Sequence, residues 1–302
     1  MKSMTKLAAL GVVAALALVG CGSASNLEGK SDNSGGSSDT LVVGSQEYYS
    51  NEILAEIYAQ SLEKAGHKVD RQLNIGQREV YMPDLQAGKI DVFPEYSGNL
   101  LQYYKSDTTA RTPEQVSTEL SSVLPKGLKA LDQAAATDQD SYVVTKAFAE
   151  EHSLKQIGDL AGIPDLKVAG NSELETRPYG PKGLQETYGV NMTIKPAEDS
   201  GGPLTVKALR DGEVQVADIY TAAPVLADGD LVVLEDPKNL FLSSNVVPIV
   251  SERVDEKAAE TLNQVSKALT AEDLISMNKR SVDNKEAASA IAADWLKSKG
   301  LA

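Results

Sequence analysis

The segment DLQAGKIDVFPEY, residues 84–96, returns in altered form as ALRDGEVQVADIY, residues 208–220, at an offset of 124 and without a gap. In each copy a helical run ends at a glycine and a short apolar run leads to a tyrosine, Tyr96 or Tyr220. A second pair, LVVGSQE and LKVAGNSE, aligns Gly44 with Gly170 at the similar offset of 126. These nearly equal offsets predict two related units, each with strands and helices.

The first unit alternates between strand and helix patterns. Short β-branched or alternating runs indicate strands, and apolar residues at helical spacing indicate helices that end near a glycine. The predicted order is strand 40–45, helix 51–66, strand 67–75, helix 79–88 and strand 89–96. This β-α-β-α-β pattern is typical of a parallel sheet flanked by helices, so we predict an α/β fold.

Two later runs are expected to connect the units. SYVVTKAF, residues 141–148, is interpreted as a crossing to the second unit, and NVVPIV, residues 245–250, as the return. Three helical stretches follow and should pack on the first unit. We therefore expect one lobe of residues 41–140 plus 246–302, a second lobe of residues 141–245, and a hinge of two segments.

The N-terminus predicts export. Lys2 and Lys6 precede an apolar run of 13 residues, Leu7 to Val19, which is too short to span a bilayer. LVGC places the single cysteine, Cys21, after this run and resembles a bacterial lipobox. We predict a signal peptide over 1–20, lipidation at Cys21 and a flexible tether over 21–40, which is rich in serine, glycine and asparagine. The alternative is an ordinary buried cysteine behind an ordinary signal peptide.

The charge balance argues against a nucleic-acid partner. The predicted signal peptide holds two of the 29 basic residues, so the remainder carries 27 basic and 43 acidic residues, a net charge of −16. Nucleic acid and anionic head groups would repel such a chain. Membrane association should therefore come from the lipid anchor.

The sequence offers little for catalysis. It has two histidines and one cysteine, and it contains no metalloprotease motif, phosphate-binding loop or nucleophile elbow. We expect no enzyme activity, no cofactor and no metal site. An extracytoplasmic hydrolase or transferase is the alternative that catalysis would require.

Tyrosine supplies most of the aromatic content, with 11 tyrosines against three phenylalanines and one tryptophan. Tyrosine rings attract quaternary ammonium groups, which cannot donate hydrogen bonds, by cation–π contacts. Ligands bind open α/β sheets at the carboxyl ends of strands, where Tyr96 and Tyr220 are predicted to lie. We expect these two rings to face each other across a crevice, and we expect Tyr58 to be buried in a helix.

Five segments carry a resemblance to a known family: GSQEYYSNEILAEIYAQSLEKAGHKV, NIGQREVYMPDLQAGKIDVFPEYSG, TRPYG, VADIYT and LVVLEDPKNLF. The chain resembles, from about residue 41 to its end, the substrate-binding lipoproteins of ABC importers for glycine betaine, choline, carnitine and related osmoprotectants. The resemblance implies a type II, two-lobed Venus flytrap of the periplasmic-binding-protein kind. It also implies an aromatic box between the lobes and a membrane permease with its ATPase as partner.

The resemblance assigns roles to particular residues. Tyr96, Tyr142 and Tyr220 would form the walls of the box. Arg177 would hold a ligand carboxylate, which a guanidinium can bind through two parallel hydrogen bonds. Pairing of Arg177 with Glu173 or Glu175 is the alternative.

Four amide residues complete the candidate ligand-binding set. Gln46 stands where many relatives have lysine, Asn99 where threonine is usual, and Asn245 where a further aromatic is often found. Asn51 is the fourth. The box would then have three tyrosines with amides at its edge, which suits choline or carnitine as well as glycine betaine.

The prediction is an extracytoplasmic, lipid-anchored, monomeric binding protein of an ABC importer that captures a quaternary-ammonium solute. The amide residues leave open a binding protein for an amino acid or another polar zwitterion. A partner of a sensing receptor is a further possibility that the sequence does not distinguish.

Overall fold

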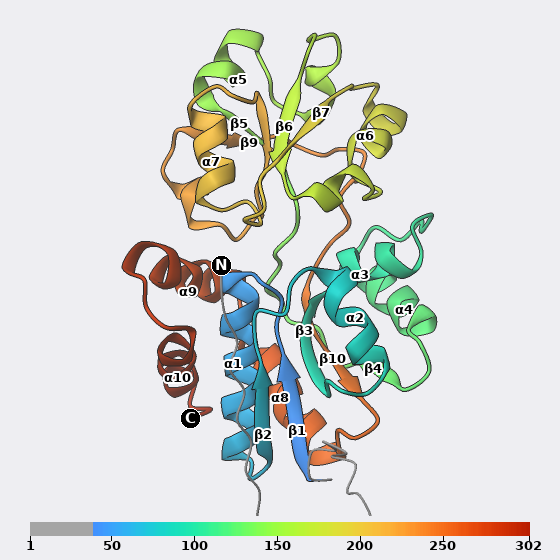
Figure 1. Ribbon diagram of the computed structural model, residues 1–302, viewed down its shortest axis with the longest axis vertical. Coiled ribbons are helices and arrows are strands. Elements are labelled where there is room, and N and C mark those ends of the chain that lie inside the picture. Colours follow the sequence, from blue (N-terminus) through green and yellow to red (C-terminus); the bar gives the residue numbers. More distant parts are fainter. Residues whose placement is uncertain (1–38) are drawn as a thin grey trace, which may run out of the picture. The chain divides into compact units, whose positions relative to one another are not determined.

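A computed structural model describes residues 39–302, which form two β-sheets with helices packed around each (Figure 1). The predicted signal peptide, Cys21 and nearly all of the predicted tether lie outside the described residues. Between residues 39 and 302, the helices are too short or too polar to cross a membrane.

The first sheet has the strand order β2-β1-β3-β10-β4. Strand β1 runs parallel to β2 and β3, whereas β10 runs antiparallel to both β3 and β4. The strands are β1 (Thr40–Gly44), β2 (Lys68–Gln72), β3 (Val92–Tyr96), β4 (Leu128–Ala130) and β10 (Val246–Ser251).

The second sheet repeats this arrangement in the order β7-β6-β8-β5-β9. Here β6 is parallel to β7 and β8, and β5 is antiparallel to β8 and β9. The strands are β5 (Tyr142–Thr145), β6 (Lys167–Gly170), β7 (Thr193–Pro196), β8 (Val216–Asp218) and β9 (Leu231–Val233). The predicted α/β fold with two related units is confirmed.

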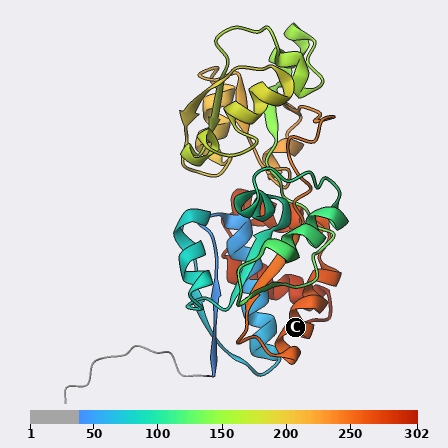
Figure 2. The same ribbon diagram turned by 90° about the vertical axis from the view of Figure 1, so that its right-hand side faces the viewer.

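Helices cover both faces of the first sheet (Figure 2). We call this sheet with its helices the first lobe. The helices are α1 (Tyr49–Lys64), α2 (Arg78–Gln86), α3 (Ser97–Tyr104), α4 (Pro113–Val123), α8 (Glu256–Ala268), α9 (Ala271–Asn284) and α10 (Ala288–Ser298).

The second lobe is the second sheet with its own helices. These are α5 (Lys146–His152), α6 (Pro181–Tyr188) and α7 (Pro203–Arg210), together with the 3₁₀ turns η1 (Ile157–Leu160), η2 (Ser172–Glu175) and η3 (Pro224–Ala227).

Alternation along the strands explains why each sheet is covered on both faces. In β3, Val92 belongs to the core under α1 and α8–α10, while Phe93 belongs to the core under α2–α4. In the second lobe, Val168 and Ala169 of β6 likewise enter different cores. Successive side chains of a strand point to opposite faces, so each apolar run supplies two cores.

Helix α1 confirms the prediction for residues 51–66 to within two residues at each end. Tyr58 is fully buried on it, as expected. Helices α8, α9 and α10 pack against α1, which confirms that the C-terminal helices return to the first lobe.

The aligned glycines end matching strands, β1 and β6. A Cβ atom on Gly44 would lie 2.9 Å from the ring of Phe93, and one on Gly170 would lie 3.2 Å from Cβ of Asp218. Each neighbouring strand therefore approaches too closely for a larger residue without adjustment.

The prediction for the crossings was wrong in detail. The run 141–148 forms β5 and the start of α5, and β5 pairs on both sides within the second sheet. The connections are the segments before β5 and before β10. These two run side by side, since the amide of Asp138 donates to the carbonyl of Ser244 (3.1 Å) and that of Val246 to Ala136 (3.0 Å).

Candidate functional site

A cavity lies at the carboxyl ends of strands from both sheets. Its lining includes Gln46, two residues beyond β1, and Tyr96, the last residue of β3. The second sheet contributes Asn171, directly after β6, and Asp218, the last residue of β8. Parallel strands of both lobes thus aim their ends at one cavity, as is general for ligand sites in open α/β sheets.

Four tyrosines line this cavity: Tyr48, Tyr96, Tyr179 and Tyr220. Tyr48 immediately precedes α1, and its ring lies 5.0 Å from that of Tyr220 at 89°, an edge-to-face contact that joins the two lobes. Tyr96 is 6% exposed, and its hydroxyl has no hydrogen-bond partner among residues 39–302. The first lobe therefore supplies two rings and the second lobe another two.

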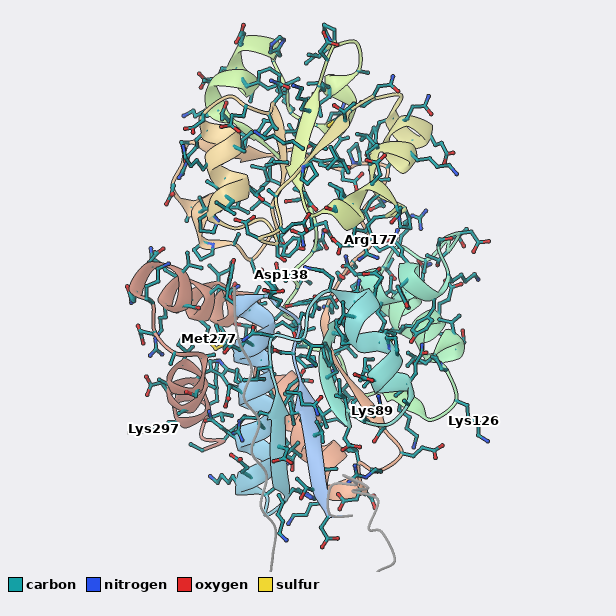
Figure 3. The ribbon with its side chains drawn as sticks, viewed as in Figure 1. Lys89, Lys126, Asp138, Arg177, Met277 and Lys297 are labelled. Atoms are coloured by element: carbon teal, nitrogen blue, oxygen red, sulfur yellow. The ribbon has the colours of Figure 1, made fainter. Side chains whose placement is uncertain are left out.

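Three buried aspartates line the same cavity. Asp138 and Asp140 lie on the connection that leads to β5, and Asp218 ends β8. Asp138 accepts hydrogen bonds from the hydroxyl of Tyr48 (2.8 Å) and the amide of Ala222 (3.0 Å). Figure 3 labels Asp138, which lies between the two sheets.

The aspartates have altered acidity because they are buried. Burial raises the pKa of Asp138 to about 7, although its hydrogen bonds with Tyr48 and Ala222 lower it. Burial also raises the pKa of Asp218 well above its usual range, and the charge of Asp140 and a hydrogen bond between the two carboxyl groups raise it further. Like charges held close together disfavour ionisation of both groups.

Two arginines line the cavity, and each is bound by a glutamate. Arg78 donates two 2.8 Å hydrogen bonds to Glu95, which is fully buried in β3. Arg177, which is labelled in Figure 3, donates to Glu79 of α2 at 2.6 and 3.2 Å. This ion pair joins the second lobe to the first.

Five of the eight predicted ligand-binding residues line the cavity: Tyr96, Tyr220, Arg177, Gln46 and Asn99. Asn99 donates to Asp140 and, at 3.1 Å, to the hydroxyl of Tyr179. The structure thus brings these predicted residues together. It pairs Arg177 with Glu79, and not with Glu173 or Glu175, which were the alternative to a ligand carboxylate.

The other three predicted residues lie behind the cavity. Tyr142 is fully buried in the core of the second lobe, where its hydroxyl donates to the carbonyl of Tyr179 at 2.6 Å. Asn51 accepts from the amide of Gln46 and donates to the carbonyl of Pro94. Asn245 donates to the carbonyl of Ala134. Their polar groups fix the backbone around the cavity.

Tyr48, Tyr179 and the aspartates line the cavity but were not among the predicted site residues. Tyr179 was within reach, because it stands in TRPYG two residues after Arg177. Asp218 also had a signal, since a carboxylate ends a buried strand in VADIY. Asp138 and Asp140 had no such signal, because nothing distinguishes them from the other acidic residues among the 43 of the chain.

The cavity does not resemble a metal centre. Within residues 39–302, histidine, cysteine and carboxylate side chains form no group that could hold a metal ion. The chemistry that the site offers is therefore that of rings, amides, buried carboxylates and two paired arginines.

These features define a class: a two-lobed α/β binding protein of the periplasmic type, with its site where the lobes meet. The chain belongs to the family described as the substrate binding domain of ABC-type glycine betaine transport systems, whose model matches residues 39–298. It is therefore a substrate-binding protein of an extracytoplasmic family that works with an ABC permease, and not an enzyme.

Curated relatives and solved structures agree with this placement. The chain is 24% identical to the glycine betaine-binding protein YehZ of Escherichia coli over 276 residues, which cover 86% of this chain and 90% of the relative. It is 24% identical over 279 residues to a glycine-betaine-binding protein of Pseudomonas aeruginosa, with 86% and 88% covered.

Among solved structures, one described as a glycine betaine/carnitine/choline ABC transporter superposes with a TM-score of 0.69 at 19% identity. It covers 86% of this chain and 99% of its own. A choline binding protein of an ABC transporter in complex with choline gives 0.61 at 15% identity, with 87% and 89% covered. At these identities the likeness establishes the fold.

Proposed function

We propose that this protein captures a quaternary-ammonium compatible solute, such as glycine betaine, choline or carnitine, and delivers it to the permease. The observation that supports the proposal is the lining of one cavity by four tyrosines from two lobes. Each cation–π contact contributes roughly 0.5 to 2 kcal/mol, so several rings together account for much of the roughly 8 kcal/mol of micromolar binding. The named ligands of the curated relatives are of the same chemical class.

We further propose that residues 41–140 with 246–302 form one moving lobe and residues 141–245 the other. A ligand that touches Tyr96 of the first lobe and Tyr220 of the second favours the closed arrangement, because only that arrangement offers both contacts. The protein would act as a monomer held at the outer face of the membrane by a lipid on Cys21.

A second candidate is a binding protein for an amino acid or another polar zwitterion. It is favoured by Gln46, whose side-chain nitrogen is buried and has no hydrogen-bond partner within residues 39–302. Such an amide donor suits a ligand that accepts hydrogen bonds.

Thermal-shift and calorimetric screens with choline, glycine betaine, carnitine, proline and common amino acids test the proposal, since a ligand that binds the folded state raises its melting temperature. We expect a methylated ammonium to bind best. Tyr96→Ala and Tyr220→Ala should each lower the affinity for this ligand at least tenfold. Tyr103→Ala, at an exposed tyrosine outside the cavity lining, should leave the affinity unchanged. A response confined to primary amines would favour the second candidate.

A further inference from the structure

Within residues 39–302, the three aspartates of the cavity form no ion pair with a basic side chain, although the charge of Arg177 lowers the pKa of Asp218. Asp138 receives its hydrogen bonds from Tyr48 and Ala222, and Asp140 receives one from the amide of Asn99. One carboxylate oxygen of Asp218, Oδ1, is buried without any hydrogen-bond partner among residues 39–302. These donors are neutral, and Asp218 and Asp140 share their negative charge through the hydrogen bond between them, so the charge of this pair is available to a ligand.

The basic groups of the cavity, in contrast, already have counter-charges. Two nitrogens of Arg78 bind both oxygens of Glu95, and two nitrogens of Arg177 bind both oxygens of Glu79. One bidentate edge of each guanidinium is thereby occupied. A ligand carboxylate would have to compete with a glutamate for the fork that it prefers.

Two neutral groups of the lining are also available to a polar ligand. The hydroxyl of Tyr96 and the side-chain nitrogen of Gln46 are buried without a hydrogen-bond partner in the described part of the chain. Tyr96 is 6% exposed and Gln46 8%. A buried polar group without a hydrogen bond is destabilising, so a polar ligand group that bonds to them would bind favourably.

We propose that this site selects a cation without a carboxylate group, with Asp218 and Asp140 as its counter-ion. The inference rests on the proposed function and narrows its ligand class. The four rings accept the methylated ammonium, and the aspartates add attraction for any cation. A carboxylate on the ligand would be repelled by the same aspartates, because little solvent is present to screen the charges.

A hydroxyl is the polar group that best suits the rest of the lining. It can donate to a carboxylate oxygen such as Oδ1 of Asp218, and it can accept from an amide nitrogen such as that of Gln46. Choline, a methylated ammonium with one hydroxyl and no carboxylate, is therefore the probe. Glycine betaine is the matched zwitterion.

The test is titration calorimetry of both ligands at pH 8 with the wild type, Asp218→Asn and Asp140→Asn. Asp84→Asn is the control, because it removes one charge at an exposed acid that pairs with Lys89 outside the cavity lining. We expect the wild type and the control to bind choline at least tenfold more tightly than glycine betaine. Each cavity variant should reduce that ratio at least fivefold, mainly through weaker choline binding, and circular dichroism should show that it is folded.

Three results would overturn the inference. The first is that glycine betaine binds as tightly as choline, and the second is that both cavity variants weaken the binding of the two ligands equally. In either case the aspartates do not select by charge, and the proposed function still stands. If no methylated ammonium binds the wild type at all, the proposed function fails together with the inference.

Discussion

The two lobes have the same strand order, and in each a buried carboxylate lies at the end of the central strand. The partners of this carboxylate differ between the lobes. In the first lobe, Glu95 of β3 is held by Arg78, by the hydroxyl of Tyr81 and by the amide of Tyr96. In the second lobe, Asp218 of β8 has no ion pair within residues 39–302 and shares its charge with Asp140, and only the more distant charge of Arg177 favours its ionised form. The shared topology thus places one acid as a structural ion pair and another as a functional group.

The largest expected effect concerns the structural pair. Arg78→Met should lower the free energy of unfolding by about 3–5 kcal/mol, because it leaves Glu95 buried without its counter-ion. Asp218→Asn should not lower it, because that carboxylate has no ion pair to lose within the described part of the chain. Urea unfolding of both variants measures the contrast.

Arg210→Met provides the control for this comparison. Its pairs with Asp228 and Asp230 are solvent-exposed, and such pairs contribute about 0–1 kcal/mol. Equal destabilisation by Arg78→Met and Asp218→Asn would show that the two strand-end carboxylates play the same part.

A slightly smaller effect is expected in the pH dependence of stability. The pKa of Asp138 rises from its ordinary 3.8 to about 7 on folding, so the folded protein binds a proton that the unfolded chain releases. Stability from this group is therefore lost as pH rises from about 4 to about 7, by up to about 4 kcal/mol.

Asp138→Asn checks this expectation without the ligand. The groups that face Asp138 are Tyr48, the amide of Ala222, Asp140 and Ser50. As pH rises from 4 to 8, the wild type should lose more unfolding free energy than the variant, so the variant becomes more stable relative to the wild type. A difference that stays constant over this range would mean that Asp138 titrates normally.

The smallest effect is expected at the ion pair that joins the lobes. Glu79→Gln should weaken the binding of choline and of glycine betaine by the same two- to fivefold, because a partly exposed pair contributes about 0.2–1 kcal/mol to the closed arrangement. The carboxylate-binding role that resemblance assigns to Arg177 predicts something else. Glu79→Gln would then free the guanidinium of Arg177 and strengthen the binding of glycine betaine alone.

Strands and helices were predictable because apolar periodicity records which face of an element is buried. The matched offsets also located β3 and β8 and, with them, Tyr96 and Tyr220. Each of these tyrosines stands close to the end of a buried strand, and this position places it at the carboxyl edge of the sheet.

The position of Tyr142 in the core of the second lobe was not predicted. This residue lies at the start of β5, and the alternation of that strand sends Tyr142 and Val144 into one core and Val143 into the other. The sequence contained this alternation, but residues 141–148 were interpreted as a connection and not as a strand of the second sheet.

The partners of polar residues were not predictable. The pairing of Arg177 with Glu79 and the meeting of Asp218 with Asp140 join residues 98 and 78 positions apart in the chain. Such contacts depend on how the lobes come together, which no local pattern encodes. Asn51 and Asn245 bind backbone carbonyls for the same kind of reason.

A crystal structure of the protein grown with choline would show whether tyrosines of both lobes hold one ligand. We expect the methylated nitrogen within about 6 Å of the ring centroids of Tyr96 and Tyr220, so that one ligand contacts both lobes. A choline bound elsewhere, or held by rings of a single lobe, would show that the lobes do not share the ligand.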